Sequence, residues 1–544
     1  MRKAIKKGIL FLLALALLSQ PLVAQGQDKD GVEVQKALDF LKKNMEGWFS
    51  LRSDNLTKYY TYINNVFERN STFTNDQFRA AYRQAQQVFP FEPEECDTLY
   101  DSQSVSADFL RENTELAYRM WKKNSRHVSF ETFCNYILPY RVGQEPVAEW
   151  RKAYMEKYGQ DVAVYPTRQH NQYHTISMHN RLNKGFNGAV YYPNRPMPEF
   201  ALKDLIPMKM GNCEAYSYRT VAQLRAFGIP ATMDFVPQWG NRSMGHSWAV
   251  MFVNDSYTLP VGMNETPGSH FDDRPELTMP KVYRMTFTKQ EWLKEIGEDK
   301  GAHLPMYFQS QRILDVTDNY VETADVTVKV TDNKQARLAK WLLLGVFNNR
   351  DWVPVAFAKI GNDGKARFDR MGKGVAYIPF FYDQYGSRHY TAAPFILNQD
   401  GTMTTLKPKE GSSREVVVTR KYWESETLKK YNRQLERGVI VVANDANFKD
   451  SLVVATVSGI TENRFHTLPL EYTGEYKFIK YISPNGSHGN IAEIELYDDL
   501  DSIVKPIRCF GGSCAWIEHW PEKVFDGNVL TSYSRMSAIS GSLS

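Results

Sequence analysis

The chain has 544 residues, of which 42% are hydrophobic and 13% aromatic, a composition typical of globular rather than disordered protein. It carries 66 basic and 62 acidic residues, and no block of like charge stands out. This balance argues against nucleic acid or an anionic membrane as the main partner. A chain of this length should divide into several domains of about 100–200 residues each.

Residues 1–26 have the three regions of a secretory signal peptide. The start is positively charged, the apolar run ILFLLALALL follows at residues 9–18, and the small residues Ala24 and Gly26 suit a signal peptidase. The apolar run is too short for a membrane span, which needs about 20 residues. We therefore expect an exported protein, secreted or periplasmic, with no membrane span. Removing this segment takes away four cations and no anions, so the mature chain is formally neutral.

The remaining chain changes its pattern several times. Residues 27–160 show the apolar spacing of amphipathic helices and predict a helical N-terminal region. Residues 161–320 mix strand and helix patterns and predict an α+β core. Residues 321–420 consist of short β-branched and aromatic runs between turns, as in a β-sandwich. A charged helical linker is predicted at 421–438.

The last segment, residues 439–544, again reads as β-strands. Its stretches GNIAEIELYD and VFDGNVLTSY resemble a discoidin-like, galactose-binding-like β-sandwich, although the segment is shorter than the usual module. The resemblance implies a glycan or other surface ligand. The fold class predicted is therefore multidomain α+β: a helical region, an α+β core and two β-sandwich domains.

The most motif-like stretch, MGNCEAYSYRTVAQLRAFGIPA, surrounds Cys213. Asn212 is a good N-cap, so Cys213 should occupy the first helical position, and Gly228 with Pro230 should end the helix. A thiol there lies near the positive end of the helix dipole and near free N–H groups, which predicts a lowered pKa of the thiol. The same N–H groups can stabilise the oxyanion that forms when a carbonyl is attacked. Alternatively, a lone Cys at a helix start is only a small buried residue.

A second motif, GHSWAVMFV, predicts a strand that begins at His246, 33 residues after Cys213. The interval has room for a helix, one strand and a loop. An imidazole on a strand beside the helix can form a thiolate–imidazolium pair with the sulfur. We therefore predict Cys213 as nucleophile and His246 as base, although His246 alone would read as an ordinary strand histidine. Trp239, in the loop before this strand, is the predicted wall of a substrate cleft.

Together, the GNC helix start, LRAFGIPA and GHSW resemble the core motif of the transglutaminase-like superfamily, over about residues 162–320. The resemblance implies a papain-like fold, a Cys-His-Asp triad and acyl transfer on amides through a thioester, without a cofactor. The chain departs from the family at the Asp, because the stretch after Tyr257 reads TLPVGMNE. We assign the third position to Asn264, with Glu265 and Asp255 as alternatives.

Five cysteines leave one unpaired. Pairing Cys509 with Cys514 and Cys96 with Cys134 would leave Cys213 as the free thiol.

The histidines His170, His174 and His179 have a metal-like spacing, but no carboxylate or Cys accompanies them, so no metal is predicted.

Two functions fit these patterns. The first is an exported thiol enzyme, a peptidase, amidase or acyl transferase, that acts on a protein or peptide substrate. The alternative is a non-catalytic surface or glycan-binding protein with a degraded site. The intact Cys213–His246 pair favours the first function, and the missing Asp favours the second.

Overall fold

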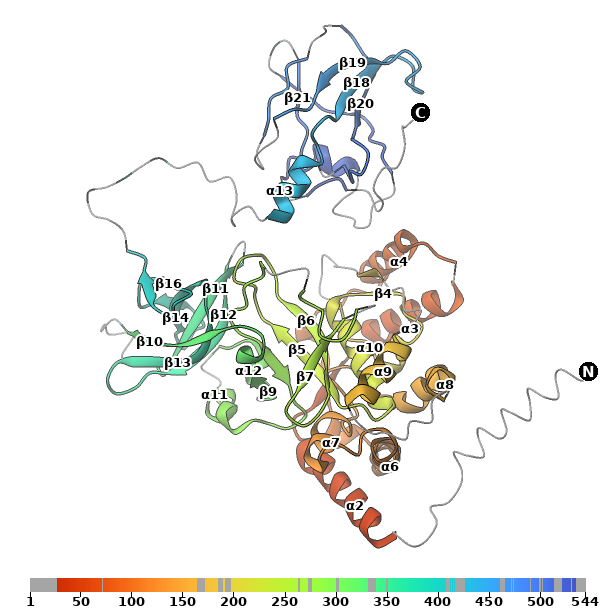
Figure 1. Cartoon of the computed structure of the whole chain (residues 1–544), viewed down its shortest axis with the longest axis vertical. Helices are drawn as coiled ribbons and strands as arrows, with labels where there is room; N and C mark the ends of the chain where they lie inside the picture. Colours follow the sequence, from red (N-terminus) through yellow and green to blue (C-terminus); the bar gives the residue numbers. More distant parts are fainter. Residues whose placement is uncertain are drawn as a thin grey trace, which may run out of the picture.

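The computed structural model describes residues 27–534 with gaps at 71, 164–171, 184–188, 191–196, 263–264, 273–275, 300–302, 331–338, 349–350, 408–410, 412, 414, 416–425, 460–464, 471, 473, 490, 499, 501, 513–520 and 530. The predicted signal peptide lies outside these residues. The described chain combines helices with several antiparallel sheets, which confirms the α+β class (Figure 1).

Helices make up most of the N-terminal region, and side-chain caps explain where several of them begin. The α-helices of the described residues are α2 (Gln27–Asn44), α3 (Asp54–Arg69), α4 (Asn75–Val88), α5 (Asp101–Ser104), α6 (Ala107–Asn124), α7 (Phe130–Tyr136), α8 (Trp150–Ala163), α9 (Gln172–Leu182), α10 (Cys213–Ala226), α11 (Lys294–Gly297), α12 (Met306–Gln309) and α13 (Glu426–Arg433). Hydroxyls of Ser53, Thr74, Ser106 and Ser129 accept a backbone N–H in the first turn of α3, α4, α6 and α7. Two short strands, β1 (Phe49–Arg52) and β2 (Asp97–Tyr100), pair among these helices.

A five-stranded antiparallel sheet carries the residues of interest. Its strand order is β7 (Thr258–Val261), β6 (His246–Phe252), β5 (Ala231–Val236), β8 (Tyr283–Met285) and β9 (Ile313–Asp315). Because side chains alternate along a strand, Ala249 and Met251 of β6 join the core cluster that contains α10, while Trp248 and Val250 join a second cluster. The helix α10 lies beside β5 and β6 (Figure 1).

The N-terminal helices and this sheet share one hydrophobic core. A single buried cluster contains Tyr59 of α3, Phe78 of α4, Val221 of α10 and Met233 of β5. Polar contacts join the same parts, since the guanidinium of Arg151, at the start of α8, donates to the carbonyl oxygens of Pro139 and Arg225 at 3.0 and 2.9 Å. The helical region therefore packs as part of the structure that positions α10. A short parallel pair, β3 (Ala189–Val190) and β4 (Met210–Gly211), precedes that helix.

Residues 323–405 form two antiparallel sheets. One pairs β10 (Thr323–Lys329) with β13 (Lys365–Gly372); the other has the order β12 (Asp351–Lys359), β11 (Trp341–Asn348), β14 (Val375–Tyr382), β16 (Phe395–Leu397) and β17 (Met403–Thr405), with β15 (Arg388–Tyr390) beside β14. Inward side chains of both sheets, such as Val326 and Leu342, form one buried cluster. The buried Lys281 donates to the carboxylate of Asp315 and to the carbonyl of Asp369, which ties the core sheet to β13.

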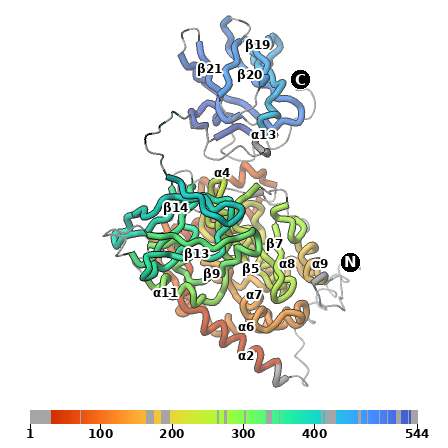
Figure 2. The backbone as a smooth tube through the Cα atoms, turned by 60° about the vertical axis from the view of Figure 1, so that its left-hand side comes forward, coloured from red at the N-terminus to blue at the C-terminus, as the bar shows by residue number. Residues whose placement is uncertain are grey.

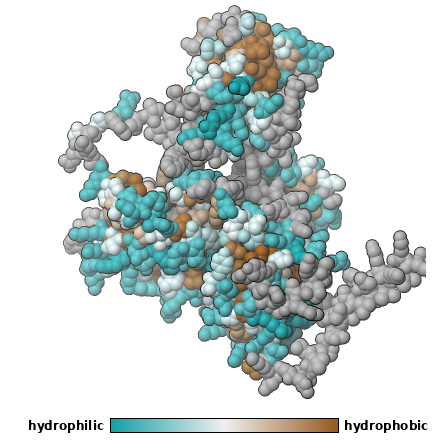
Figure 3. Space-filling view, in the orientation of Figure 1, coloured by the Kyte–Doolittle hydropathy of each residue, from teal (hydrophilic) through white to brown (hydrophobic). Residues whose placement is uncertain are grey.

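The C-terminal residues form a separate body (Figures 1 and 2). Strands β19 (Leu452–Thr456), β18 (Val439–Ala443) and β20 (Phe478–Ile482) make one antiparallel sheet, and β21 (Leu496–Tyr497) pairs with β22 (Ile503–Val504). The stretches 489–498 and 524–533 meet, because the backbone of Ile491 bonds to that of Tyr533 in both directions. An apolar patch is visible on this body (Figure 3), and its large apolar side chains include the exposed Leu500 and Phe510.

Candidate active site

The helix α10 begins at Cys213, as its N-cap predicts. The backbone of Asn212 is extended, and its side-chain Oδ1 accepts the N–H of Ala215 at 2.8 Å. At the other end, Gly228 has a φ of +73°, and a Cβ at this position would lie 2.3 Å from the carbonyl oxygen of Met120. Only glycine satisfies both constraints. The predicted start and end of the helix are thus confirmed.

The sulfur of Cys213 lies against β6. The backbone N–H groups of Ser247, the residue after His246, and of Cys213 and Glu214 lie near this sulfur and favour its thiolate form. Burial nevertheless raises the pKa of the thiol, and these three N–H groups only oppose that shift. The predicted lowering of the pKa is therefore wrong, because desolvation of the thiolate outweighs the N–H groups of the helix start. Cys213 consequently needs a base to become a nucleophile.

The imidazole of His246 is held by a second imidazole. Its Nε2 lies 3.1 Å from Nε2 of His270, and Nδ1 of His270 lies 2.6 Å from Oε2 of Glu265. The two rings are within 9° of parallel with centroids 5.4 Å apart, so they lie end to end in one plane. We refer to His246, His270 and Glu265 as the histidine relay.

A glycine makes room for the relay. Gly262 directly follows β7, and a Cβ at this position would lie 2.0 Å from Oε2 of Glu265 and 2.7 Å from Nδ1 of His270. Neither distance is compatible with a side chain, so the carboxylate and the imidazole occupy the space that a larger residue would fill.

Aromatic side chains enclose the relay. The ring of Trp239 stacks on that of His246 with centroids 6.0 Å apart, and Trp239 is only 4% exposed. The ring centroid of Trp248 lies 5.8 Å from that of His246; its Nε1 donates to the hydroxyl of Tyr320 at 3.0 Å, and that hydroxyl donates to Asp234 at 2.7 Å. These contacts fix the indole beside His246 and His270. The predicted role of Trp239 in substrate binding remains a prediction.

Three carboxyl groups lie close together around the start of α10. Burial raises the pKa of Glu145, of Glu199 and of Glu214, and in Glu199 the neighbouring carboxyls act in the same direction. Glu145 accepts the N–H groups of Val142 and Gly143 at 2.7 and 2.8 Å. At Cys213, the charge of Glu214 acts in the same direction as burial and raises the pKa of the thiol.

The other candidates for the third position have different surroundings. Asn264 lies outside the described residues. Asp255 accepts the N–H of Ser129 at 2.8 Å and so supports the start of α7. Glu265 does belong to the site, but it reaches His246 only through His270. The residue that the sequence reasoning missed is thus His270, which stands alone in a polar loop and has no motif around it.

The remaining histidines predicted to be without a metal are core residues. His174 and His179 are 7% and 2% exposed on α9, and burial lowers the pKa of His179 to about 4. His170 lies outside the described residues. In the part of the chain that the structure describes, no three His, Cys, Asp or Glu side chains are grouped to hold a metal.

The proposed Cys96–Cys134 disulfide is wrong, because both thiols are free. Cys134 is buried in the core around α7, where burial raises its pKa to about 12, whereas Cys96 lies near the carbonyl of Glu92. Cys509 is also free, and Cys514 lies outside the described residues.

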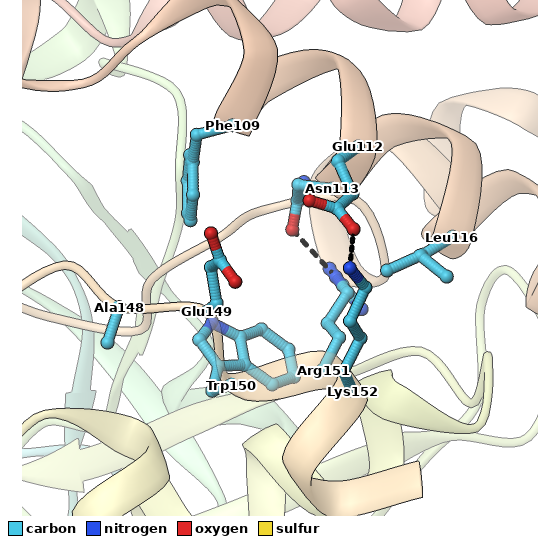
Figure 4. Close-up of a pocket in the computed structure, with 9 residues that line it drawn as sticks. All are labelled: Phe109, Glu112, Asn113, Leu116, Ala148, Glu149, Trp150, Arg151 and Lys152. Atoms are coloured by element: carbon cyan, nitrogen blue, oxygen red, sulfur yellow. Dashed lines mark hydrogen bonds and ion pairs between the residues drawn. The ribbon is translucent and has the colours of Figure 1, made fainter.

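A pocket between α6 and the start of α8 lies elsewhere (Figure 4). Phe109 and Leu116 line it together with two polar pairs, Arg151 with Asn113 at 2.7 Å and Lys152 with Glu112. The guanidinium of Arg151 already donates to backbone carbonyls, so these N–H groups are not available to a ligand in the pocket.

Comparisons with known proteins give little. No protein-family model and no curated protein matches the sequence. A proposed cysteine protease from Cytophaga hutchinsonii is 14% identical over 24% of this chain and 45% of that one, with a TM-score of 0.15. The periplasmic domain of TgpA from Pseudomonas aeruginosa, bound to ethylmercury, is 16% identical over 24% of this chain and 48% of that one, with a TM-score of 0.18. The chain covers less than half of either structure, and TM-scores this low do not show a shared fold.

Proposed function

We propose that the chain is an exported thiol enzyme of the transglutaminase-like type that attacks amide carbonyls with Cys213. The observation that carries the proposal is the position of the sulfur, which lies near the backbone N–H of Ser247, the residue after His246, while Nε2 of His246 faces His270 at 3.1 Å. This arrangement leaves Nδ1 as the ring nitrogen that takes the thiol proton.

The chemistry follows from these positions. His246 Nδ1 takes the proton of Cys213 and the sulfur attacks the carbonyl. The N–H groups of Cys213 and Glu214, which lie near the sulfur, can then stabilise the developing oxyanion. Expulsion of the amine, which takes the proton from His246, leaves a thioester. Water or a second amine then attacks the thioester and gives its proton to His246, and the thiol is regenerated. Water gives hydrolysis, and an amine gives acyl transfer.

The test compares thiols within one chain. Iodoacetamide should label Cys213 near neutral pH at least about tenfold faster than the free thiol of Cys96, measured peptide by peptide with mass spectrometry. His246→Ala should slow the labelling of Cys213 by about 100-fold and leave Cys96 unchanged. The matched control is His389→Ala, since His389 lies 2.8 Å from Asp383 in the sandwich. Equal labelling of Cys213 in the parent and in His246→Ala would refute the proposal.

The type of acyl acceptor needs a separate assay. With casein as a general acyl donor, peptide release reports hydrolysis, and incorporation of monodansylcadaverine reports acyl transfer. Cys213→Ser should abolish both while leaving thermal unfolding unchanged. Unfolding of this variant would instead favour a structural thiol.

Export and a surface ligand complete the proposal, and both rest on the sequence patterns. The mature protein should begin at Gln27, which N-terminal sequencing would check, and residues 439–544 should bind a glycan or other surface ligand on an array. Among the described residues, no helix is long and apolar enough to cross a membrane.

A further inference from the structure

Behind His246, this protein places an imidazole and not a carboxylate from the neighbouring strand. We infer that His270, backed by Glu265, is the positioning pair that sets the tautomer and the orientation of His246. The inference rests on the proposed function, because a tautomer matters only if His246 acts as the base for Cys213.

With both imidazoles neutral and Glu265 ionised, the hydrogen-bond chain has one direction. An ionised carboxylate only accepts, so Nδ1 of His270 carries the hydrogen that it donates to Glu265 at 2.6 Å. Nε2 of His270 then has a lone pair and accepts the Nε2–H of His246 at 3.1 Å. His246 is thereby left with its lone pair on Nδ1, which is the form that a base needs.

The position of the pair relative to β7 explains why a loop residue does this. A side chain at Gly262 would collide with both Glu265 and His270, so the end of β7 supplies space instead of a ligand for His246. The loop that follows β7 folds back and fills this space with the His270 ring.

The packing holds the pair rigidly. His270 is 7% exposed, its ring contacts that of Phe271 with centroids 4.5 Å apart, and Trp248 covers it at 6.1 Å. Water is therefore kept from the contact between the two imidazoles, where it would compete for the hydrogen bond. The side chain of Glu265 is 29% exposed, so its charge stays partly solvated.

A purely structural role for His270 would depend on its ring, whereas a positioning role depends on its Nε2. Two substitutions separate these properties. His270→Phe keeps an aromatic ring and removes the acceptor. His270→Gln removes the ring and offers an amide oxygen where Nε2 was.

The experiment measures the rate at which iodoacetamide labels Cys213 in the full chain. We expect His270→Phe to lower this rate by about 100-fold and His270→Gln to recover at least about tenfold of the loss. Glu265→Gln should also lower the rate, because a neutral amide oxygen accepts the Nδ1–H of His270 more weakly than a carboxylate does and no longer fixes its tautomer. The control is His389→Phe, which removes the histidine–carboxylate pair of His389 and Asp383. This variant should leave the labelling rate of Cys213 unchanged.

The outcomes distinguish the two levels of the argument. If His246→Ala fails to slow labelling, the proposed function is refuted. If His246→Ala slows labelling but His270→Phe reacts like the parent, or faster than His270→Gln, only the inference about the relay is refuted. Should His270→Phe unfold, the comparison of His270→Gln with Glu265→Gln decides, since the amide at 270 keeps an acceptor and should be the more reactive of the two.

Discussion

Among the described residues, two pairs of histidines show what turns an imidazole into part of a site: His174, His179 and His270 are buried, and His246 is half-buried. His174 and His179 lie on α9, and Nε2 of His179 has no hydrogen-bond partner among the residues that the structure describes. His246 and His270 lie at the end of β6 and in the loop after β7, and a carboxylate completes their chain. The spacing along the sequence would favour the first pair as a ligand cluster. A carboxylate partner, and not spacing, distinguishes His270 from His179.

The largest contrast should appear when one histidine is removed from each pair. His246→Ala should reduce labelling of Cys213 by about 100-fold, whereas His179→Phe should leave it within about twofold of the parent. Labelling rates of both variants in the full chain give the comparison directly. A large loss in His179→Phe, with the fold intact, would mean that α9 also serves the nucleophile.

Protonation of His179 should lower the stability of the fold at low pH. His179 has its pKa lowered from 6.5 to about 4 by burial, so the unfolded chain binds the proton more readily. Its contribution is complete above pH 6.5 and is lost as the pH falls towards 4, which amounts to about 3 kcal/mol. Denaturant unfolding of the parent and of His179→Phe at pH 7 and pH 4.5 would test this. The variant should lose less stability between these pH values.

Filling the space beside Glu265 and His270 should have a smaller effect on the labelling of Cys213. Gly262→Ala places a Cβ against Glu265 and His270, so the two side chains must move apart. We expect Cys213 labelling to fall by about tenfold, because the tautomer of His246 is no longer fixed.

Gly486→Ala is the matched control for Gly262→Ala, since nothing lies within 4 Å of a Cβ at Gly486, although its φ of +82° will cost some stability. Unchanged labelling in Gly262→Ala would show that the relay tolerates displacement and would weaken the distinction between the two pairs.

Local signals in the sequence were sufficient for the helix and strand that carry Cys213 and His246. The cap Asn212, the stop Gly228 and the strand start at His246 act within a few residues, so they can be read directly. The relay could not be predicted in this way, because a polar loop has to fold back 24 residues beyond His246 to bring His270 into place. The one available signal was negative: the stretch after Tyr257 lacks the expected Asp.

The errors about the cysteines have a similar physical origin. The pKa of Cys213 depends on how much of the sulfur is desolvated, and a helix start alone does not determine this. Likewise, Cys134 lies inside the core, where the chain around Cys96 does not reach it. Both properties depend on packing between distant segments.

The common core of Tyr59, Phe78, Val221 and Met233 has a consequence for how the protein melts. Helices far upstream and the sheet of the site lose their packing in the same event, because neither surface can be exposed without the other. Calorimetry should therefore record a single cooperative endotherm for these two regions. Proteolytic cleavage between α3 and α10 should abolish the rapid labelling of Cys213, because it unfolds the core against which α10 packs.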